Sequence, residues 1–184
     1  MSIISIDNFD ISKFDKETVF VLDTNILYFV HSGYYLPDNK KTIKYSNLIQ
    51  NIIANGFTIS VSTLNLQELY FGIENKEYNL YCKLNNINQR KYTKKNFRKD
   101  LDERKNVKNK LLSVSAELQN YIIKNSSIDN EFLNTFIDQY EMHRMDPVDF
   151  LLTNNYNINK TIFITDDKDF LSIPAVNVLI IWYF

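Results

Sequence analysis

The chain has 184 residues, 45% of them hydrophobic and 23% charged, which is ordinary for a globular domain, enough for one substantial core and short for two domains. Its three Gly and three Pro leave little room for flexible linkers, and a formal net charge of −1 at pH 7 indicates no class of partner by itself. The single cysteine excludes an internal disulfide framework and a Cys-rich zinc site, and the sequence has neither a secretory leader nor an apolar run approaching the ~20 residues that span a bilayer, so we expect a cytoplasmic protein without a membrane partner.

The first part of the chain alternates strand patterns with helix patterns. A short apolar run of the buried-strand kind ends at Asp23. Asn55-Gly56 closes a later helix, because glycine tolerates the left-handed conformation at a helix end. Ser62 or Thr63 can cap the helix that follows the second strand. The expected elements are a strand at 19–22, a helix from 26, a helix at 42–54, a strand at 57–61 and a helix from 64.

A polar, Asn-rich and basic segment interrupts this alternation. Its apolar residues are too sparse to predict a core, and we expect helix with loop. The elements expected after it are an amphipathic helix at 110–124, a very short strand at 126–128, a helix from Asp129, a helix from Pro147, a strand at 161–164 and a strand at 176–182. Alternating strands and helices predict an α/β fold with a mainly parallel sheet of about five strands, flanked by helices in three layers.

Acidic residues recur where these strands end. Asp23 closes the first strand, and Asp166 and Asp167 follow the strand at 161–164. Sites in open parallel sheets form beyond the carboxyl ends of the strands, so two distant segments deliver carboxylates to one edge. Glu68, on the helix after the second strand, lies in the turns nearest that edge. The spacing therefore predicts a cluster of acids.

A further pair of acids, Asp146 and Asp149, lies three residues apart at a helix start and shares one helix face. Carboxylates gathered in one cleft repel one another and raise each other's pKa. Hard divalent cations relieve that repulsion, and Mg²⁺ and Mn²⁺ prefer oxygen ligands. Such ions activate water and stabilise phosphoryl displacement. The acids therefore predict a Mg²⁺ or Mn²⁺ site of the kind that supports phosphoryl displacement.

Four segments, in order, resemble the PIN-domain nuclease family, which includes the VapC-like toxin ribonucleases. Residues 21–25 resemble its opening strand and Asp-Thr-Asn motif, and residues 66–72 resemble its Glu-bearing helix with a glycine four residues later. Residues 149–152 resemble the helix start that carries its third acid, and residues 165–170 resemble the Thr-x-Asp segment that carries its fourth. The resemblance implies a PIN-like fold over residues 1–184 as a single domain, with a basic, helical insertion at about 76–109.

The resemblance also assigns roles by position. The acids implied to bind metal and to be catalytic are Asp23, Glu68, Asp149 and Asp167, with Asp146, Asp166 and Asp169 as secondary candidates. The implied supporting polar residues are Thr24, Asn25 and Thr165. Thr24 has two readings, a hydrogen bond to a neighbouring carboxylate or a helix cap.

The implied function is metal-dependent cleavage of single-stranded or structured RNA, as by the toxin of a toxin–antitoxin pair. RNA, an antitoxin protein and a second copy of the chain are the implied partners. Two alternatives stay open at this point. One is a PIN-like module of weak catalysis that binds RNA or protein, and the other is a DNA-directed, structure-specific nuclease.

The basic segment is the candidate for contacting a phosphate backbone. Between residues 81 and 110 there are eleven Lys and Arg against three acids, on an otherwise acidic chain. Such cations supply sequence-independent, salt-sensitive attraction to nucleic acid. The residues expected to bind nucleic acid are Lys91, Lys94, Lys95 and Arg98. Tyr81, Tyr92 and Phe97 are expected to stack on bases. A solvated helix face or a partner-binding segment explains the same charges.

Overall fold

The computed structural model describes residues 3–35, 38–126, 130–139, 147–167, 169–172 and 178–180. Within them, six strands form one sheet in the order β1-β6-β5-β2-β3-β4, and every neighbouring pair is parallel. The strands are β1 (Ile3–Ser5), β2 (Val19–Leu22), β3 (Thr58–Ser62), β4 (Ile122–Lys124), β5 (Thr161–Thr165) and β6 (Val178–Ile180). The α/β class with a parallel sheet is confirmed, and β1 is a strand that the sequence did not predict.

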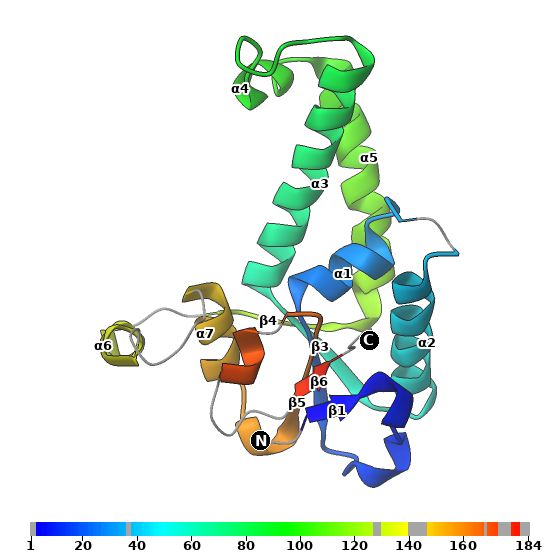
Figure 1. The fold of residues 1–184 in the computed structure, drawn as a ribbon, viewed down its shortest axis with the longest axis vertical. Coiled ribbons are helices and arrows are strands. Elements are labelled where there is room, and N and C mark those ends of the chain that lie inside the picture. Colours follow the sequence, from blue (N-terminus) through cyan, green and yellow to red (C-terminus); the bar gives the residue numbers. More distant parts are fainter. Residues whose placement is uncertain are drawn as a thin grey trace.

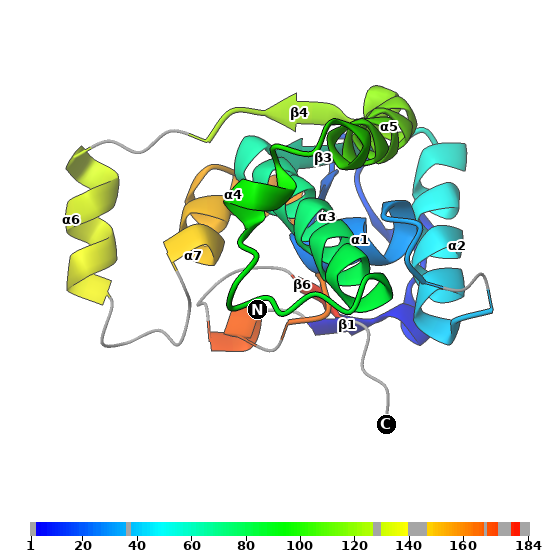
Figure 2. The same ribbon diagram turned by 90° about the horizontal axis from the view of Figure 1, so that it is seen from above.

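Helices cover the sheet on opposite sides, with α2 and α7 flanking the strands in both views (Figures 1 and 2). The helices are α1 (Thr24–His31), α2 (Lys40–Ala54), α3 (Thr63–Leu84), α4 (Lys94–Phe97), α5 (Leu101–Glu117), α6 (Asn130–Gln139) and α7 (Pro147–Asn154). Short 3-10 turns lie at Ile6–Asn8, Ile11–Lys13, Leu118–Asn120, Ile158–Lys160 and Asp169–Ser172. None of the described helices combines the length and the apolar character needed to cross a bilayer.

The central strand, β2, is covered on both faces, which is typical of parallel sheets. Phe20, Val21 and Leu22 of β2 are fully buried, as expected for a strand with helices on both faces. β2 pairs with β3 on one side and β5 on the other. Asp23 therefore lies at the carboxyl edge of the sheet, next to its middle strand, and α1 begins directly after it.

The prediction of a helix at 110–124 is wrong at its C-terminal end. α5 stops at Glu117, and the chain forms β4 from Ile122, which pairs with Ser60 of β3. The Ser60 hydroxyl also donates to the Ile122 carbonyl at 3.0 Å. Pairing with β3 overrides the helical spacing, because a β-branched pair suits an edge strand. The short strand expected at 126–128 is not at Ser126, and residues 127 and 128 lie outside the described residues.

The basic segment folds as a helical hairpin, here defined as residues 73–117, in which α3 and α5 pack side by side and α4 lies at the end far from the sheet (Figure 1). The expectation that it has too few apolar residues for a core is wrong. Tyr78, Cys82, Phe97 and Val107 form a buried cluster of their own. These four residues are spread over three helices, so their contact is invisible to a search for local periodicity.

Candidate active site

A cleft of about 380 Å³ lies where β2 and β5 end and where α3 and α7 begin. The four acids proposed from the sequence, Asp23, Glu68, Asp149 and Asp167, all line this cleft. Each comes from a different segment, and the parallel sheet and the helix starts bring them together. The remaining described residues of the lining are Thr24, Asn25, Tyr28, Phe29, Tyr35 and Gly72.

Asp23 is the most buried of these acids, with 7% of its surface exposed. It caps α1, because its Oδ1 accepts from the Thr24 backbone N–H at 2.6 Å. Its Oδ2 accepts from the Thr165 hydroxyl at 2.6 Å and from the Asn25 amide at 2.7 Å. Hydrogen bonds from the start of α1 and from the end of β5 thus hold this carboxylate in one orientation.

Burial raises the pKa of the Asp23 carboxyl to about 6. The hydrogen bonds from Thr165 and from the Thr24 backbone act in the opposite direction, since they favour the charged form. The negative charges of Glu68 and Asp167 raise the pKa further. The cleft therefore places other negative charges beside a carboxyl group that water solvates poorly.

A chain of polar contacts positions Glu68. The Thr24 hydroxyl donates to Glu68 Oε2 at 2.6 Å, and the Asn65 side-chain amide donates to Thr24 Oγ1 at 2.9 Å. Ser62, which caps α3, donates to Asn65 Oδ1 at 2.5 Å. Of the two roles expected for Thr24, its side chain has the hydrogen bond to a neighbouring carboxylate, and Asp23 is the residue that caps α1. Asn65 is 1% exposed and was missed in the sequence, where only its spacing from the Ser62 cap marks it.

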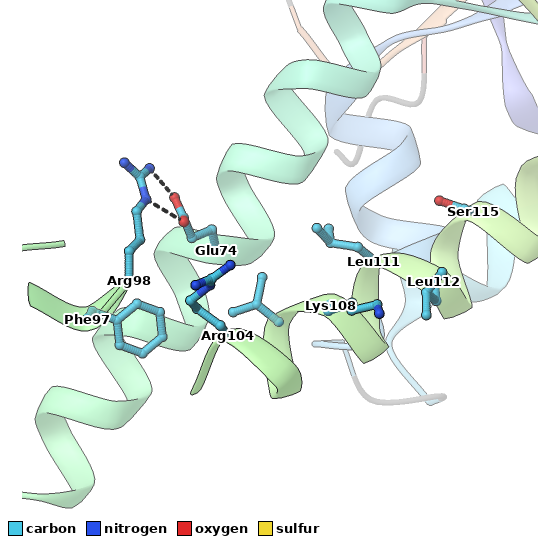
Figure 3. A pocket seen from close by; sticks show the side chains of 9 residues that line it. Glu74, Phe97, Arg98, Arg104, Lys108, Leu111, Leu112 and Ser115 are labelled. Carbon is cyan, nitrogen blue, oxygen red and sulfur yellow. Dashed lines mark hydrogen bonds and ion pairs between the residues drawn. The ribbon is translucent and has the colours of Figure 1, made fainter. Parts of the chain in front are cut away.

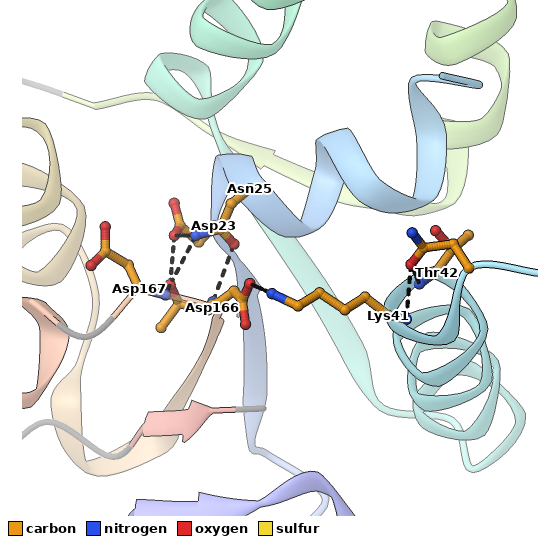
Figure 4. A network of polar contacts seen from close by, with 8 residues as sticks. Asp23, Asn25, Lys41, Thr42, Asp166 and Asp167 are labelled. Atoms are coloured by element: carbon orange, nitrogen blue, oxygen red, sulfur yellow. Dashed lines mark hydrogen bonds and ion pairs between the residues drawn. The ribbon is translucent and has the colours of Figure 1, made fainter. Parts of the chain in front are cut away.

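The structure separates the three neighbouring acids after β5. The Asp167 backbone N–H donates to Thr165 Oγ1 at 2.9 Å, and its side chain lines the cleft. Asp166 forms an ion pair with Lys41, and its carboxylate lies on the opposite side from that of Asp167 (Figure 4). Asp169 donates its backbone N–H to Asp167 Oδ1 and does not line the cleft. Asp146 lies outside the described residues.

The donor set suits a hard divalent cation. Carboxylate oxygens dominate the polar lining, and no lysine or arginine is among the described residues that line the cleft. In the part of the chain that the structure describes, no three Asp, Glu, His or Cys side chains stand together as a ready-made set of ligands. Mg²⁺ commonly binds through one or two carboxylates and keeps several waters. The residues therefore fit a partly hydrated ion.

The basic residues proposed from the sequence lie at the far end of the hairpin. Lys91, Lys94 and Lys95 are exposed there. Arg98 differs from them, because its Nε donates to Glu74 Oε1 at 2.7 Å in a two-bonded ion pair (Figure 3). This pair borders a groove of about 510 Å³ that also includes Arg104, Lys108 and Leu112.

The three aromatic residues of the hairpin that were expected to stack on bases differ in their exposure. Phe97 is 1% exposed and sits in the hairpin core, so it cannot stack on a base in this fold. Tyr81 and Tyr92 stack on each other, with ring centroids 5.7 Å apart. Both rings pack against the hairpin core. The prediction is therefore wrong for Phe97, while base stacking by the half-buried Tyr81 and Tyr92 stays a prediction.

Comparison with known proteins identifies the fold and no more. No family model matches the chain, and no curated protein matches it. The crystal structure of VapBC2 from Rickettsia felis bound to a DNA fragment from its promoter is similar, with a TM-score of 0.53 and 18% identity. The match covers 88% of this chain and 97% of that chain. This likeness shows a PIN-like α/β fold.

Proposed function

We propose that this chain is a metal-dependent nuclease of the PIN type, which hydrolyses phosphodiester bonds of RNA, single-stranded or structured, with Mg²⁺ or Mn²⁺. The observation that carries the proposal is the cleft itself. Acids from four separate segments line it, at the carboxyl edge of a parallel sheet. No lysine or arginine is among the described residues that line the cleft, so the lining itself offers no cation beside the buried Asp23 carboxylate.

Each acid has a proposed role. Asp23, Glu68, Asp149 and Asp167 would hold the cation, which when bound activates water and stabilises the charge that develops on the scissile phosphate. Thr165 and Asn25 would keep the Asp23 carboxylate turned into the cleft through the bonds described above. The Thr24 hydroxyl would fix the rotamer of Glu68.

The likeness to VapBC2 supports a toxin role for this chain, with an antitoxin protein as a partner. A homodimer belongs to the same proposal. Co-expression with the gene next to its own, followed by purification and measurement of mass in solution, tests both partners together.

The test of the proposed function is incubation of the purified full-length protein with labelled single-stranded RNA and, separately, single-stranded DNA. We expect RNA cleavage with Mg²⁺ or Mn²⁺ and none with EDTA. The matched variants are Asp167→Asn and Asp166→Asn, since these neighbours lie on opposite sides of the chain. Asp167→Asn should lower the cleavage rate by about 10²-fold or more, and Asp166→Asn by much less.

Three results would reject parts of this proposal. Cleavage that persists in EDTA excludes the metal, and equal rates for the two asparagine variants exclude the assignment of Asp167. Cleavage of DNA in preference to RNA makes the chain a DNA-directed nuclease.

The exposed basic tip of the hairpin is proposed to contact the phosphate backbone of longer RNA. Reversing Lys91, Lys94 and Lys95 to glutamate should weaken binding of a long single-stranded RNA and flatten its dependence on salt, because each lost phosphate contact reduces counterion release. Arg98 is left unchanged, since its ion pair with Glu74 also stabilises the hairpin. Affinity measured at several salt concentrations checks this. An unchanged salt slope would assign the tip to another partner.

A further inference from the structure

One wall of the acid cleft is aromatic, which the sequence did not reveal. Tyr28 and Phe29 come from α1, and Tyr35 comes from the segment that follows it. All three line the same cleft as the four acids and are neither fully buried nor fully exposed. Nucleic acid that approached the acids would therefore meet aromatic rings within the same cleft.

The rings of this wall contact one another. The Tyr28 and Tyr35 centroids are 5.9 Å apart with an interplanar angle of 85°, and the Phe29 and Tyr35 centroids are 4.6 Å apart. Tyr34 stacks on Tyr28 with a centroid distance of 5.8 Å and an interplanar angle of 28°. Distances of this kind are those of favourable aromatic pairs. The wall is thus a continuous surface whose rings support one another.

The hairpin holds this wall from behind. The Tyr34 hydroxyl donates to Glu77 Oε1 at 2.6 Å, and its oxygen lies 3.3 Å from the Ile73 carbonyl oxygen. Glu77 forms an ion pair with Lys110 at 2.8 Å, and Lys110 Nζ lies 4.3 Å from the centroid of the Tyr34 ring. Tyr34 is therefore clamped between the hairpin and Tyr28. An ordered wall loses less conformational entropy when it binds a ligand.

Gly72 of α3 leaves space for the Tyr28 ring. A Cβ at Gly72 would lie 3.2 Å from Tyr28 Cε2, which is tighter than nine in ten Cβ contacts in proteins. The missing side chain lets the ring lie against the helix that carries Glu68. Among the described residues, neither the Tyr28 nor the Tyr35 hydroxyl has a hydrogen-bond partner. Both hydroxyls remain available to a ligand.

We propose that Tyr28 and Tyr35 form an aromatic platform for one unpaired nucleobase of the substrate, which stacks on one ring and meets the other edge-to-face, since the two ring planes differ by 85°. The proposal rests on the proposed nuclease function. Carboxylates repel a phosphate backbone, so a cleft lined by acids needs another source of attraction before a cation is bound. Stacking on aromatic rings provides it, because every base has a π-face, and it depends little on sequence. Paired bases in a duplex cannot present that face, so the platform selects single strands.

The experiment measures binding without cleavage. Fluorescence anisotropy in EDTA compares a short single-stranded oligoribonucleotide with its duplex and with versions carrying one abasic residue at each position in turn. We expect the intact single strand to bind the full-length protein best, with one abasic position weakening binding most. Tyr35→Leu and Tyr28→Leu should each weaken binding of the intact strand by about five- to 150-fold. The same variants should lose the penalty at that abasic position.

Matched variants separate stacking from packing. Tyr35→Phe keeps a ring and should keep most of the affinity. Phe71→Leu removes a 55% exposed ring from α3 that does not line the cleft, and it should bind as the unaltered protein does. Thermal denaturation identifies any variant that fails to fold. Should Tyr28→Leu fail, Tyr35→Leu, which lies outside α1, decides the question.

The outcomes distinguish this proposal from the nuclease function on which it rests. Base-dependent binding that Tyr35→Leu removes supports the platform, even if Mg²⁺ brings no cleavage and the nuclease proposal fails. Metal-dependent cleavage together with unchanged affinity in both leucine variants overturns the platform alone. Equal affinity for the single strand and the duplex also overturns it.

Discussion

Asp23→Asn is expected to lower the rate of metal-dependent cleavage by about 10²–10³-fold or more, the largest effect of any single change in the cleft. Asp23 lies at the end of the central strand, and both of its oxygens accept hydrogen bonds that orient it. Asparagine has nearly the same shape but carries no charge to attract a cation. Cleavage at the unaltered rate would show that this carboxylate does not take part.

The same variant should change how stability depends on pH. The folded pKa of Asp23, about 6, lies above its value of 3.8 in an unstructured chain. Between about pH 4 and pH 6 the folded state therefore keeps a proton that the unfolded state has lost, so stability falls as pH rises through this window. This pKa shift corresponds to a loss of about 3 kcal/mol of stability. The loss is complete at pH values above the folded pKa. Asp23→Asn should lack this loss.

Urea denaturation of both proteins at several pH values measures this difference. We expect the free energy of unfolding of the variant, relative to that of the unaltered protein, to increase from about pH 4 to pH 7. Mn²⁺ at about pH 7.5 should raise the melting temperature of the unaltered protein more than that of the variant, because an ion that binds only the folded state stabilises it. Parallel pH profiles would contradict the burial argument, and equal Mn²⁺ effects would place the ion elsewhere.

Phe97→Ala is expected to destabilise the hairpin by about 3–5 kcal/mol, the range for a fully buried phenylalanine. Phe97 contacts the rings of Tyr78 and Tyr81, at centroid distances of 5.7 Å and 5.6 Å, and joins α4 to α3. The buried residues of the hairpin cluster are different from those of the main core, and Leu111 packs against both. The loss should therefore appear first as local opening of the hairpin end.

Hydrogen exchange resolved by segment measures this effect. Amides of α4 and of the adjoining ends of α3 and α5 should exchange faster in Phe97→Ala, while those of β2 and β5 stay protected. Leu101→Ala is the matched control, since Leu101 is 73% exposed, and it should change little. Faster exchange throughout β2 as well would show that the hairpin and the sheet unfold as one unit. That outcome would indicate that residues 1–184 form a single domain that unfolds cooperatively.

Local patterns in the amino-acid sequence were enough to predict several parts of this protein. The apolar run before Asp23 and the one before Thr165 are long and unbroken enough to mark buried parallel strands, and both are strands in the structure. Because parallel strands end at one edge, the acids that follow them were predictable as neighbours. Ser62 as a helix cap follows from equally local chemistry.

Other features depend on partners distant in the chain and became visible only in the folded protein. Ile122 became strand because β3 lay beside it, and Phe97 became core because α3 and α5 enclosed it. Asp166 and Asp167 have the same local environment in the sequence, and the position of Lys41 on α2 separates them. The aromatic wall likewise needs Gly72 to lie against Tyr28. The physical reason is shared: the contacts that settle each case join residues far apart in the chain, and periodicity or spacing contains no information about them.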